Sequence, residues 1–266
     1  MSQNHWNFYQ KGLISNQPPY HTFTVDKNEL FSQYNQALYI RWDSDFDSSQ
    51  SRKYYHVVKD GACNIESLPR KTRNMVRKCL KCCEIKMVDC QYIIANGGYD
   101  VYLSEYRRYE RKGFRTKPKS KDKWSEGMRE AAIRGQEFWT VSYGGDIVAY
   151  SICMRKELHV DLVTWKVDYD RFSNLYPSYG LVYSMCEYYL HQDGVSYVND
   201  GGRSLTQHSS VQDFLIEKFG FRKAYTKLNA VFRWYLLLPL IVLSPFENLV
   251  KNIKLRSMIR LYKWSR

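Results

Sequence analysis

EFWTVSYGGDIVAYSICMR, residues 137–155, is the stretch that decides the fold. Apolar and polar residues alternate from Glu137 to Tyr143, and the run from Asp146 to Arg155 continues as a second strand-like segment. Gly144-Gly145 stands between the two runs, and a two-glycine loop is typical of a tight hairpin. The sequence therefore predicts an antiparallel β-hairpin at the centre of the chain.

Strands and helices follow this hairpin in a regular order. A third strand is expected at Leu158–Val167, a helix at Gly180–His191, a short strand at Val195–Val198 and a helix at Val211–Phe219. One or two final strands are expected within Phe221–Tyr235. The segment after residue 136 therefore predicts a sheet with interspersed helices.

The segment before the hairpin contains one clear helix, at residues 67–84 (SLPRKTRNMVRKCLKCCE). Its apolar residues recur every three or four positions, and its six cations against one acid favour a phosphate-facing role. Strands are expected at Ala37–Trp42 and Tyr54–Val58. The runs 43–50 and 107–123 are expected to be loops, and the second is strongly basic.

Composition and charge limit the classes of protein. The chain has 266 residues, 44% of them hydrophobic, which is enough apolar material to bury a core and excludes a wholly disordered chain. There are 40 Lys and Arg against 27 Asp and Glu, a net charge of +13. This charge favours anionic partners such as phosphates, nucleic acid or an acidic membrane surface.

The cysteines and the first residues bear on the compartment. The first 25 residues contain no apolar core behind a basic start, so no secretory signal is visible. Seven cysteines, an odd number, suit reduced thiols in the cytoplasm. Cys79, Cys82, Cys83 and Cys90 could be read as zinc ligands, but without a turn-forming Gly or Pro we expect packing residues and no metal site.

The C-terminal segment combines an apolar stretch with a basic helix. WYLLLPLIVLSPF at 234–246 is too short to span a bilayer and is interrupted by Pro239 and Pro245. The residues after it alternate apolar and basic side chains. Residues 236–266 therefore predict contact with an anionic membrane surface, at the inner face of the cytoplasmic membrane. The alternative is a helix that packs on its own domain.

Three local features resemble one fold family. They are LPRKTRNMVRKCLKCCEIKM, the central hairpin EFWTVSYGGDIVAYSICMRKE, and VNDGGRSLTQHSSVQDFLIEKFGFRKAY. Together, in this order, they resemble the GNAT-fold N-acyltransferases, and most closely the Fem-type branch that includes peptidoglycan-bridge aminoacyltransferases. The resemblance covers about residues 37–235.

This resemblance implies an α+β fold with an α/β three-layer arrangement. A GNAT-like mixed, mostly antiparallel sheet would be flanked by helices, and the chain would end in an amphipathic helix. It also implies three segments. Residues 1–135 would form a partial GNAT-like layer with the basic helix and loop, 136–235 the core acyltransferase region, and 236–266 the apolar hook and basic tail.

The resemblance also places a candidate catalytic site where two neighbouring strands diverge, expected between Ser142–Arg155 and Val195–Asp200. Asp200 ends a strand before two glycines and is our first choice for binding the amine or accepting its proton, although Asp-Gly is also a turn dipeptide. His208 is a candidate base, with a passive loop histidine as the alternative. Tyr143 is a candidate hydrogen-bond donor to the acyl carbonyl.

The acyl donor is less well defined by the sequence. Ser178, Tyr179 and Gly180 begin a helix and could offer backbone donors to a phosphate, and Arg203 could bind an anionic donor or pair with Asp200. The segment before this helix keeps one glycine of the usual acetyl-CoA motif and lacks its arginine. Acyl-CoA, acyl carrier protein and aminoacyl-tRNA therefore all remain candidate donors.

The leading functional hypothesis is transfer of an acyl or aminoacyl group to a small-molecule or lipid-linked amine in cell-envelope or surface-polysaccharide synthesis. The alternative is a nucleic-acid- or tRNA-binding protein on a GNAT-like scaffold without acyl-CoA chemistry. A third is an inactive membrane-surface adaptor that uses the tail. The polysaccharide assignment rests on the family resemblance alone.

Overall fold

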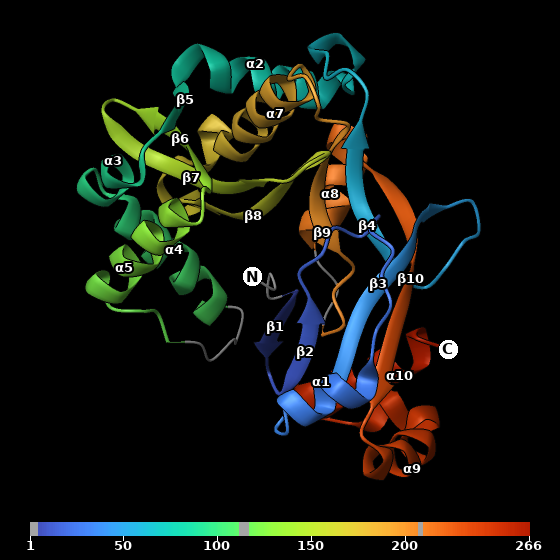
Figure 1. Ribbon diagram of the computed structural model, residues 1–266. Helices are drawn as coiled ribbons and strands as arrows, with labels where there is room; N and C mark the ends of the chain where they lie inside the picture. The colour runs from blue at the N-terminus through green and yellow to red at the C-terminus, as the bar shows by residue number, and fades with distance from the viewer. Residues whose placement is uncertain (1–4, 112–116, 207–209) are drawn as a thin grey trace. The chain divides into compact units, whose positions relative to one another are not determined.

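The computed structural model describes residues 5–111, 117–206 and 210–266 (Figure 1). The chain forms two compact units, and each combines segments that are distant in sequence. Unit 1 contains Met1–Val57, Gly202–Val211 and Lys223–Arg266, and unit 2 contains Val58–Gly201 and Gln212–Arg222. The three consecutive segments that the family resemblance implies, 1–135, 136–235 and 236–266, stay a prediction.

Unit 1 is built on strands in the order β1-β2-β3-β10. The β1/β2 and β3/β10 pairs are antiparallel, and β2/β3 is parallel. The bounds are β1 Trp6–Tyr9, β2 Gly12–Ser15, β3 Tyr39–Ser48, β10 Arg222–Phe232, α1 Lys27–Gln33, α9 Trp234–Leu243, η3 Ser244–Leu249 and α10 Ile253–Trp264.

Strand β3 is longer than expected. The loop expected at 43–50 is wrong as far as Ser48, because Asp43 and Ser44 pair with Leu228 and Lys227 of β10. The register then shifts, and Asp45 and Asp47 adopt positive φ angles of 50° and 58°. The run of short polar residues therefore forms an irregular strand, because a partner far away in sequence supplies its hydrogen bonds.

Unit 2 contains strands in the order β9-β8-β7-β6-β5. All neighbours pair antiparallel except β8 and β9, which are parallel. The strands are β5 Glu84–Val88, β6 Glu137–Tyr143, β7 Asp146–Arg155, β8 His159–Val167 and β9 Tyr197–Gly202. The helices are η1 Ile65–Ser67, α2 Arg70–Cys82, α3 Cys90–Ala95, α4 Gly98–Arg111, α5 Lys121–Ile133, α6 Tyr169–Phe172, η2 Ser173–Leu175, α7 Pro177–Leu190 and α8 Ser210–Phe219. The chain passes from unit 1 to unit 2 within β4, Tyr55–Asp60.

The central hairpin forms as the sequence predicts. Tyr143 pairs with Asp146 across the turn, and Gly144 and Gly145 both have positive φ angles, 59° and 92°. Two successive residues at positive φ define the turn whose twist matches that of the flanking strands, and glycine adopts this conformation without steric cost.

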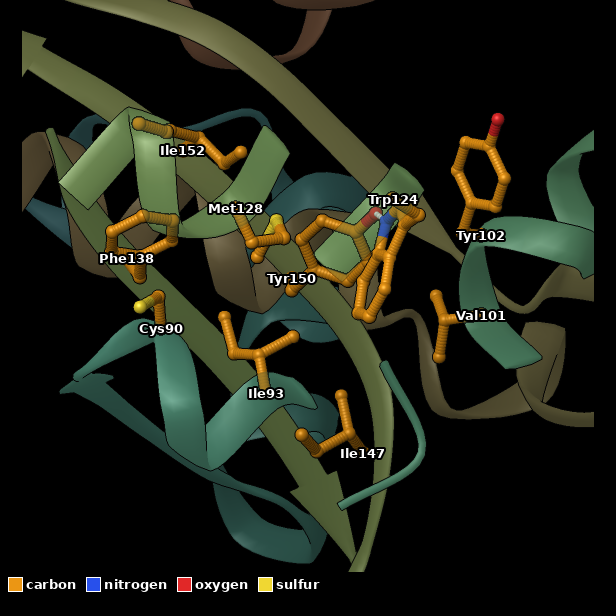
Figure 2. Packing of buried hydrophobic residues seen from close by; sticks show 11 residues of the cluster. Cys90, Ile93, Val101, Tyr102, Trp124, Met128, Phe138, Ile147, Tyr150 and Ile152 are labelled. Carbon is orange, nitrogen blue, oxygen red and sulfur yellow. Dashed lines mark hydrogen bonds between the residues drawn. The ribbon is translucent and has the colours of Figure 1, made fainter. Parts of the chain in front are cut away.

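Helices cover both faces of the unit 2 sheet (Figure 1). Helices α2 and α7 lie on one face, and α3, α4 and α5 lie on the other. On the second face, Trp124 of α5 donates its Nε1–H to the Tyr150 hydroxyl of β7, and both side chains are buried with Phe138 and Ile152 (Figure 2). Each large apolar side chain buried here stabilises the fold by roughly 1.5–3 kcal/mol.

The C-terminal elements carry an exposed apolar surface, which we call the α9 surface and define by Trp234, Leu238, Ile241, Val242 and Leu249. Trp234 is 81% exposed, Leu238 70% and Leu249 75%. The opposite side of these helices packs within unit 1 through Leu240, Ile259 and Leu261.

Within the described residues, no single helix is long and apolar enough to cross a bilayer. The segments Trp234–Leu249 and Ile253–Trp264 pass the length and composition criteria only as a pair, which is bent by 116°.

These observations confirm the expected fold class. The strands form mixed, mostly antiparallel sheet, helices flank it, and the chain ends in an amphipathic helix, α10.

Candidate functional site

Strands β8 and β9 of unit 2 pair over only three residues. His159, Val160 and Asp161 lie opposite Tyr197, Val198 and Asn199, and the ladder between the two strands ends there. Strand β8 continues as far as Val167, still paired with β7. We call the point at which the β8–β9 ladder ends the β8/β9 fork.

The fork corrects one expectation. The diverging strands were expected to be Ser142–Arg155 and Val195–Asp200, but β7 is not the neighbour of β9, because β8 lies between them. The strands follow one another along the chain in the predicted order. Strand β8, the third of them, lies between β7 and β9 in the sheet because it pairs with both.

Two local irregularities lie at the fork. Val163 is an extra residue in β8, since Leu162 and Thr164 pair with consecutive residues of β7, and its side chain is 50% exposed. Gly201 of β9 has φ +89°, a conformation that a residue with a Cβ adopts only with strain. A bulge in one strand and a left-handed residue in the other explain why regular pairing stops.

Asp161 is the centre of a polar cluster at the fork. Its Oδ1 accepts a hydrogen bond from Asn199 Nδ2 at 2.7 Å and lies 3.1 Å from His159 Nε2. Burial raises the pKa of Asp161, but the hydrogen bond and charge of His159, together with the Asn199 amide, outweigh it and hold the pKa below its usual value. This carboxylate is therefore ionised at neutral pH.

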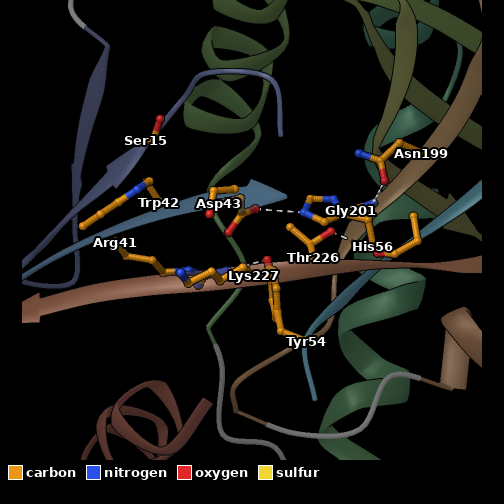
Figure 3. Close-up of polar contacts among 12 residues, drawn as sticks. Ser15, Arg41, Trp42, Asp43, Tyr54, His56, Asn199, Gly201, Thr226 and Lys227 are labelled. Atoms are coloured by element: carbon orange, nitrogen blue, oxygen red, sulfur yellow. Dashed lines mark hydrogen bonds and ion pairs between the residues drawn. The ribbon is translucent and has the colours of Figure 1, made fainter. Parts of the chain in front are cut away.

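Asn199 also fixes the backbone of the fork. Its Oδ1 accepts a hydrogen bond from Gly201 N at 2.9 Å, which Figure 3 draws between the two labelled residues. One side chain thus links Asp161 to the turn that ends the ladder.

Asp200 follows Asn199 in strand β9. Because successive strand residues point to opposite faces of a sheet, the Asp200 side chain lies on the face opposite to Asn199. Burial raises the pKa of Asp200 to about 7, although the hydrogen bond with Gln212 of α8 partly opposes this shift. Gln212 Nε2 also donates to the Gly201 carbonyl oxygen at 3.4 Å. Asp200 can therefore gain and lose a proton near neutral pH.

The fork therefore holds two carboxyl groups in different states. Asp161 is ionised because it is paired, whereas Asp200 titrates near neutrality because it is partly removed from water beside the neutral Gln212. A carboxyl group that titrates near neutral pH, as Asp200 does, is suited to accept and release a proton.

The residues expected to bind the donor begin helix α7. Ser178 is buried and shares a hydrogen bond with Tyr169, and the Tyr179 ring packs 5.0 Å from that of Phe214. The amides of Tyr179 and Gly180 both donate to the Tyr176 carbonyl, at 2.9 and 3.3 Å. Two of the expected phosphate donors are thus engaged within the turn.

Gly180 has a packing role in addition. A Cβ at this position would stand 2.5 Å from Cys79 Sγ and 2.7 Å from Ile85 Cδ1. Glycine therefore lets helices α2 and α7 approach closely, which is a structural reason for its presence.

The sequence singles out three further site residues, Tyr143, Arg203 and His208. Tyr143 ends β6, is exposed, and places its ring edge-on to Phe172 at 6.3 Å. Arg203 belongs to unit 1, where its guanidinium donates to the Lys53 carbonyl at 2.8 Å. His208 lies outside the described residues.

Sequence reasoning missed His159, Asp161 and Asn199. Their signals are the alternation His-Val-Asp at the start of β8 and Asn199 just before Asp200. Neither pattern reveals that the two strands are neighbours, which only the three-residue ladder establishes.

Unit 1 holds a second polar network, on β3 and the segment leading into β4 (Figure 3). Arg41 donates to the Tyr54 hydroxyl at 2.7 Å, and Asp43 Oδ2 lies 2.8 Å from His56 Nε2. Burial raises the pKa of Tyr54 beyond the physiological range, so this hydroxyl stays protonated. The network fixes buried polar groups of unit 1 in one arrangement.

No metal site is apparent in the part of the chain that the structure describes. There, no group of three or more His, Cys, Asp or Glu side chains is close enough to hold an ion. All seven cysteines are free thiols, and Cys79 and Cys83 are buried.

No protein-family model and no curated protein matches this sequence. Among solved structures, FemX aligns with 81% of this chain and 77% of its own, at 13% identity and a TM-score of 0.58. This similarity confirms the GNAT-like fold expected from the sequence.

Two other solved structures align more loosely. A conserved protein of unknown function from Bacteroides thetaiotaomicron aligns at 11% identity and a TM-score of 0.47, over 78% of this chain and 66%, just under two thirds, of its own. The C-terminal DUF2156 domain of a protein assigned as a lysylphosphatidylglycerol synthetase, from Agrobacterium fabrum, aligns at 13% identity and 0.43, over 80% and 69%.

Proposed function

We propose that this protein is an acyltransferase that moves an acyl or aminoacyl group from an activated donor to an amine acceptor. The observation that supports it is the β8/β9 fork of a GNAT-like sheet, where two carboxyl groups differ in protonation. A fold hosts many functions, so the proposal rests on this site as well as on the fold.

In the proposed reaction the acceptor amine attacks the carbonyl carbon of the donor ester or thioester. A C–N bond forms, and the C–O or C–S bond to the donor breaks. The attacking nitrogen must lose a proton, and Asp200 takes it because its pKa of about 7 matches neutral conditions. The proton then passes to the departing alkoxide or thiolate, so no covalent enzyme intermediate is needed.

Asp161 has a different role in this proposal. Its carboxylate stays ionised, held by His159 and Asn199, and supplies a fixed negative charge at the fork. Because Asn199 and Asp200 are successive strand residues, Asp161 lies on the face of the sheet opposite to Asp200, and its role is to hold the Asn199 side chain and the end of the ladder in place.

We favour aminoacyl-tRNA as the donor over acyl-CoA, and acyl carrier protein remains an alternative. The engaged amides of Tyr179 and Gly180, and the close packing at Gly180, leave the start of α7 poorly suited to a pyrophosphate. The cations of α2 offer a phosphate-binding surface instead, since Arg70, Arg77 and Lys81 are exposed.

The proposed place of the reaction is the inner face of the cytoplasmic membrane, where a lipid-linked amine of envelope or surface-polysaccharide synthesis would be the acceptor. The exposed apolar side chains of the α9 surface support this location, together with Lys251 and Lys254, which are exposed nearby in sequence.

The test is mass spectrometry of an envelope-lipid and metabolite extract incubated with the protein and each donor class in turn: aminoacyl-tRNA, acyl-CoA and acyl carrier protein. The proposal predicts an added acyl mass on an amine with one donor class, which is absent with Asp200→Asn. An extract unchanged by every donor would contradict it.

A further inference from the structure

A cationic pocket of about 240 Å³ lies within unit 1, at the C-terminal end of α10. Its five basic lining residues are Arg52, Lys53, Lys227, Lys263 and Arg266, and no acidic side chain is among the described residues that line it. We call it the α10 pocket. None of the residues assigned to acyl transfer lines it.

The cations of the α10 pocket are only partly neutralised. Lys263 pairs with Glu247 at 2.7 Å and Arg52 with Asp45 at 3.2 Å. Within the described residues, no carboxylate pairs with Lys53 or Lys227. An anion in the pocket would supply the missing acceptors, and charge-assisted hydrogen bonds are the strong ones.

The walls of the pocket are aromatic and held in place. Trp264 lines it, and the Arg203 guanidinium lies 4.7 Å from the centre of the Trp264 ring. Arg203 also holds the Lys53 backbone through its hydrogen bond to the carbonyl oxygen. Tyr54 forms another wall, with its hydroxyl bound to Arg41, and Figure 3 shows Tyr54, Thr226 and Lys227 together.

We propose that the α10 pocket binds the phosphoryl group of a phosphomonoester or phosphodiester, carried by a small soluble molecule or by a lipid headgroup. Five cations recognise the phosphate oxygens, and Trp264 and Tyr54 pack against the organic part of the ligand. The volume exceeds that of one phosphate ion, so the ligand extends beyond its phosphoryl group. This inference goes beyond acyl transfer and stands or falls independently of it.

The test compares wild type with Lys53→Gln/Lys227→Gln by isothermal titration calorimetry with glycerol 3-phosphate. Both lysines are exposed, so the variant should fold normally. We expect saturable one-to-one binding by wild type and a loss of about tenfold or more in affinity in the variant. Lys121→Gln/Lys123→Gln on α5 removes the same charge elsewhere and should change the affinity less than about twofold.

A second arm identifies the source of the phosphoryl group. Vesicles of phosphatidylglycerol are compared with vesicles of phosphatidylcholine, for wild type and both double variants. Binding of phosphatidylglycerol that falls only in Lys53→Gln/Lys227→Gln supports a lipid headgroup, and binding of glycerol 3-phosphate alone supports a soluble ligand.

Three results would overturn the proposal. One is the absence of saturable binding of both probes, up to ~10 mM for glycerol 3-phosphate. Another is an equal loss in the two double variants, which would show a response to net charge alone. The third is binding of RNA without binding of either probe.

Discussion

Single residues at the β8/β9 fork differ in charge because their surroundings differ. Asp161 accepts hydrogen bonds from a neighbouring amide and a histidine, whereas the half-buried Asp200 has a neutral amide, that of Gln212, beside it. The carboxyl group of Asp161 is thus held ionised, whereas that of Asp200 is close to its titration midpoint at neutral pH. Opposite effects of pH on the stability of the two variants follow from this difference.

Asp200→Asn should stabilise the protein in alkaline solution. The folded protein keeps the Asp200 proton up to about pH 7, whereas the unfolded chain releases it near pH 4. The stabilising contribution of this group is therefore complete below about pH 4 and is lost as the pH rises through 7. Urea unfolding should give a variant more stable by ~2–4 kcal/mol at pH 8 and of wild-type stability at pH 3.

Equal stabilities of this variant and wild type at pH 8 would contradict the burial argument for Asp200. Asp193→Asn, an exposed aspartate of the same unit, is the control and should behave as wild type at both pH values.

Asp161→Asn should show the opposite dependence. The lowered pKa of Asp161 means that its stabilising contribution is present above about pH 4 and is lost as the pH falls through its folded value. Urea unfolding at pH 7 should show a loss of ~1–3 kcal/mol that disappears near pH 2. A loss independent of pH would mean that packing, and not charge, holds this residue.

Only part of the candidate site can be predicted from the sequence residue by residue. Asp200 can be singled out because it precedes two glycines at the end of a strand. Asp161 and Asn199 cannot be paired from the sequence, because they lie 38 positions apart and meet only through strand register.

At the scale of elements, helix α7 depends on one glycine. Its contact with α2 requires Gly180, where a Cβ would meet Cys79 Sγ at 2.5 Å and Ile85 Cδ1 at 2.7 Å. From the sequence, Gly180 is predicted to bind a phosphate. Its packing role cannot be deduced from local spacing, since Cys79 is about a hundred positions away.

Gly180→Ala should therefore destabilise unit 2, by ~1–3 kcal/mol in urea unfolding, because α7 must move away from α2. Gly127→Ala is the matched control. Gly127 lies within α5, where only a flexible lysine end, Lys119 Nζ at 3.8 Å, approaches its Cβ position. This control should stabilise by ~0.5–1 kcal/mol through helix propensity, and an equal gain at Gly180 would refute the packing argument.

The α9 surface gives a second prediction for an element. Trp234→Ser/Leu238→Ser removes two of its most exposed apolar side chains without touching the buried Leu240. We expect cosedimentation with phosphatidylglycerol vesicles to fall about fivefold or more, because buried apolar area drives interfacial binding. Unchanged cosedimentation, with an unchanged melting temperature, would exclude the surface as a membrane contact.

Elements themselves are largely predictable from the sequence. The central hairpin, α2, α7 and α8 are confirmed near their expected bounds, because periodicity and glycine turns are local signals. The strand that pairs with β9 is distant in sequence and cannot be identified from local signals. For this reason the prediction names β7 as the neighbour of β9, whereas the neighbour is β8.

For the whole molecule, the least predictable feature is how distant segments combine. Unit 1 joins the first 57 residues to the last 44 through the β3/β10 ladder, in which Trp42 pairs with Asn229. Neither strand indicates this pairing in its own sequence, because any irregular or amphipathic strand can serve as a partner. The α+β class can be predicted from the sequence, because it depends on the order of strands and helices, and the hairpin and the helices after it indicate that order.

Acyl transfer at the β8/β9 fork, with Asp200 as proton acceptor, is the central proposal for the whole molecule. The most direct measurement is the transfer rate against pH, with the donor that gives product, for wild type, Asp200→Asn and Asp193→Asn. We predict a wild-type rate that rises with an apparent pKa of about 7, a loss of ~10²-fold or more in Asp200→Asn, and no change in Asp193→Asn. Transfer by Asp200→Asn at the wild-type rate and with the same pH profile would contradict it.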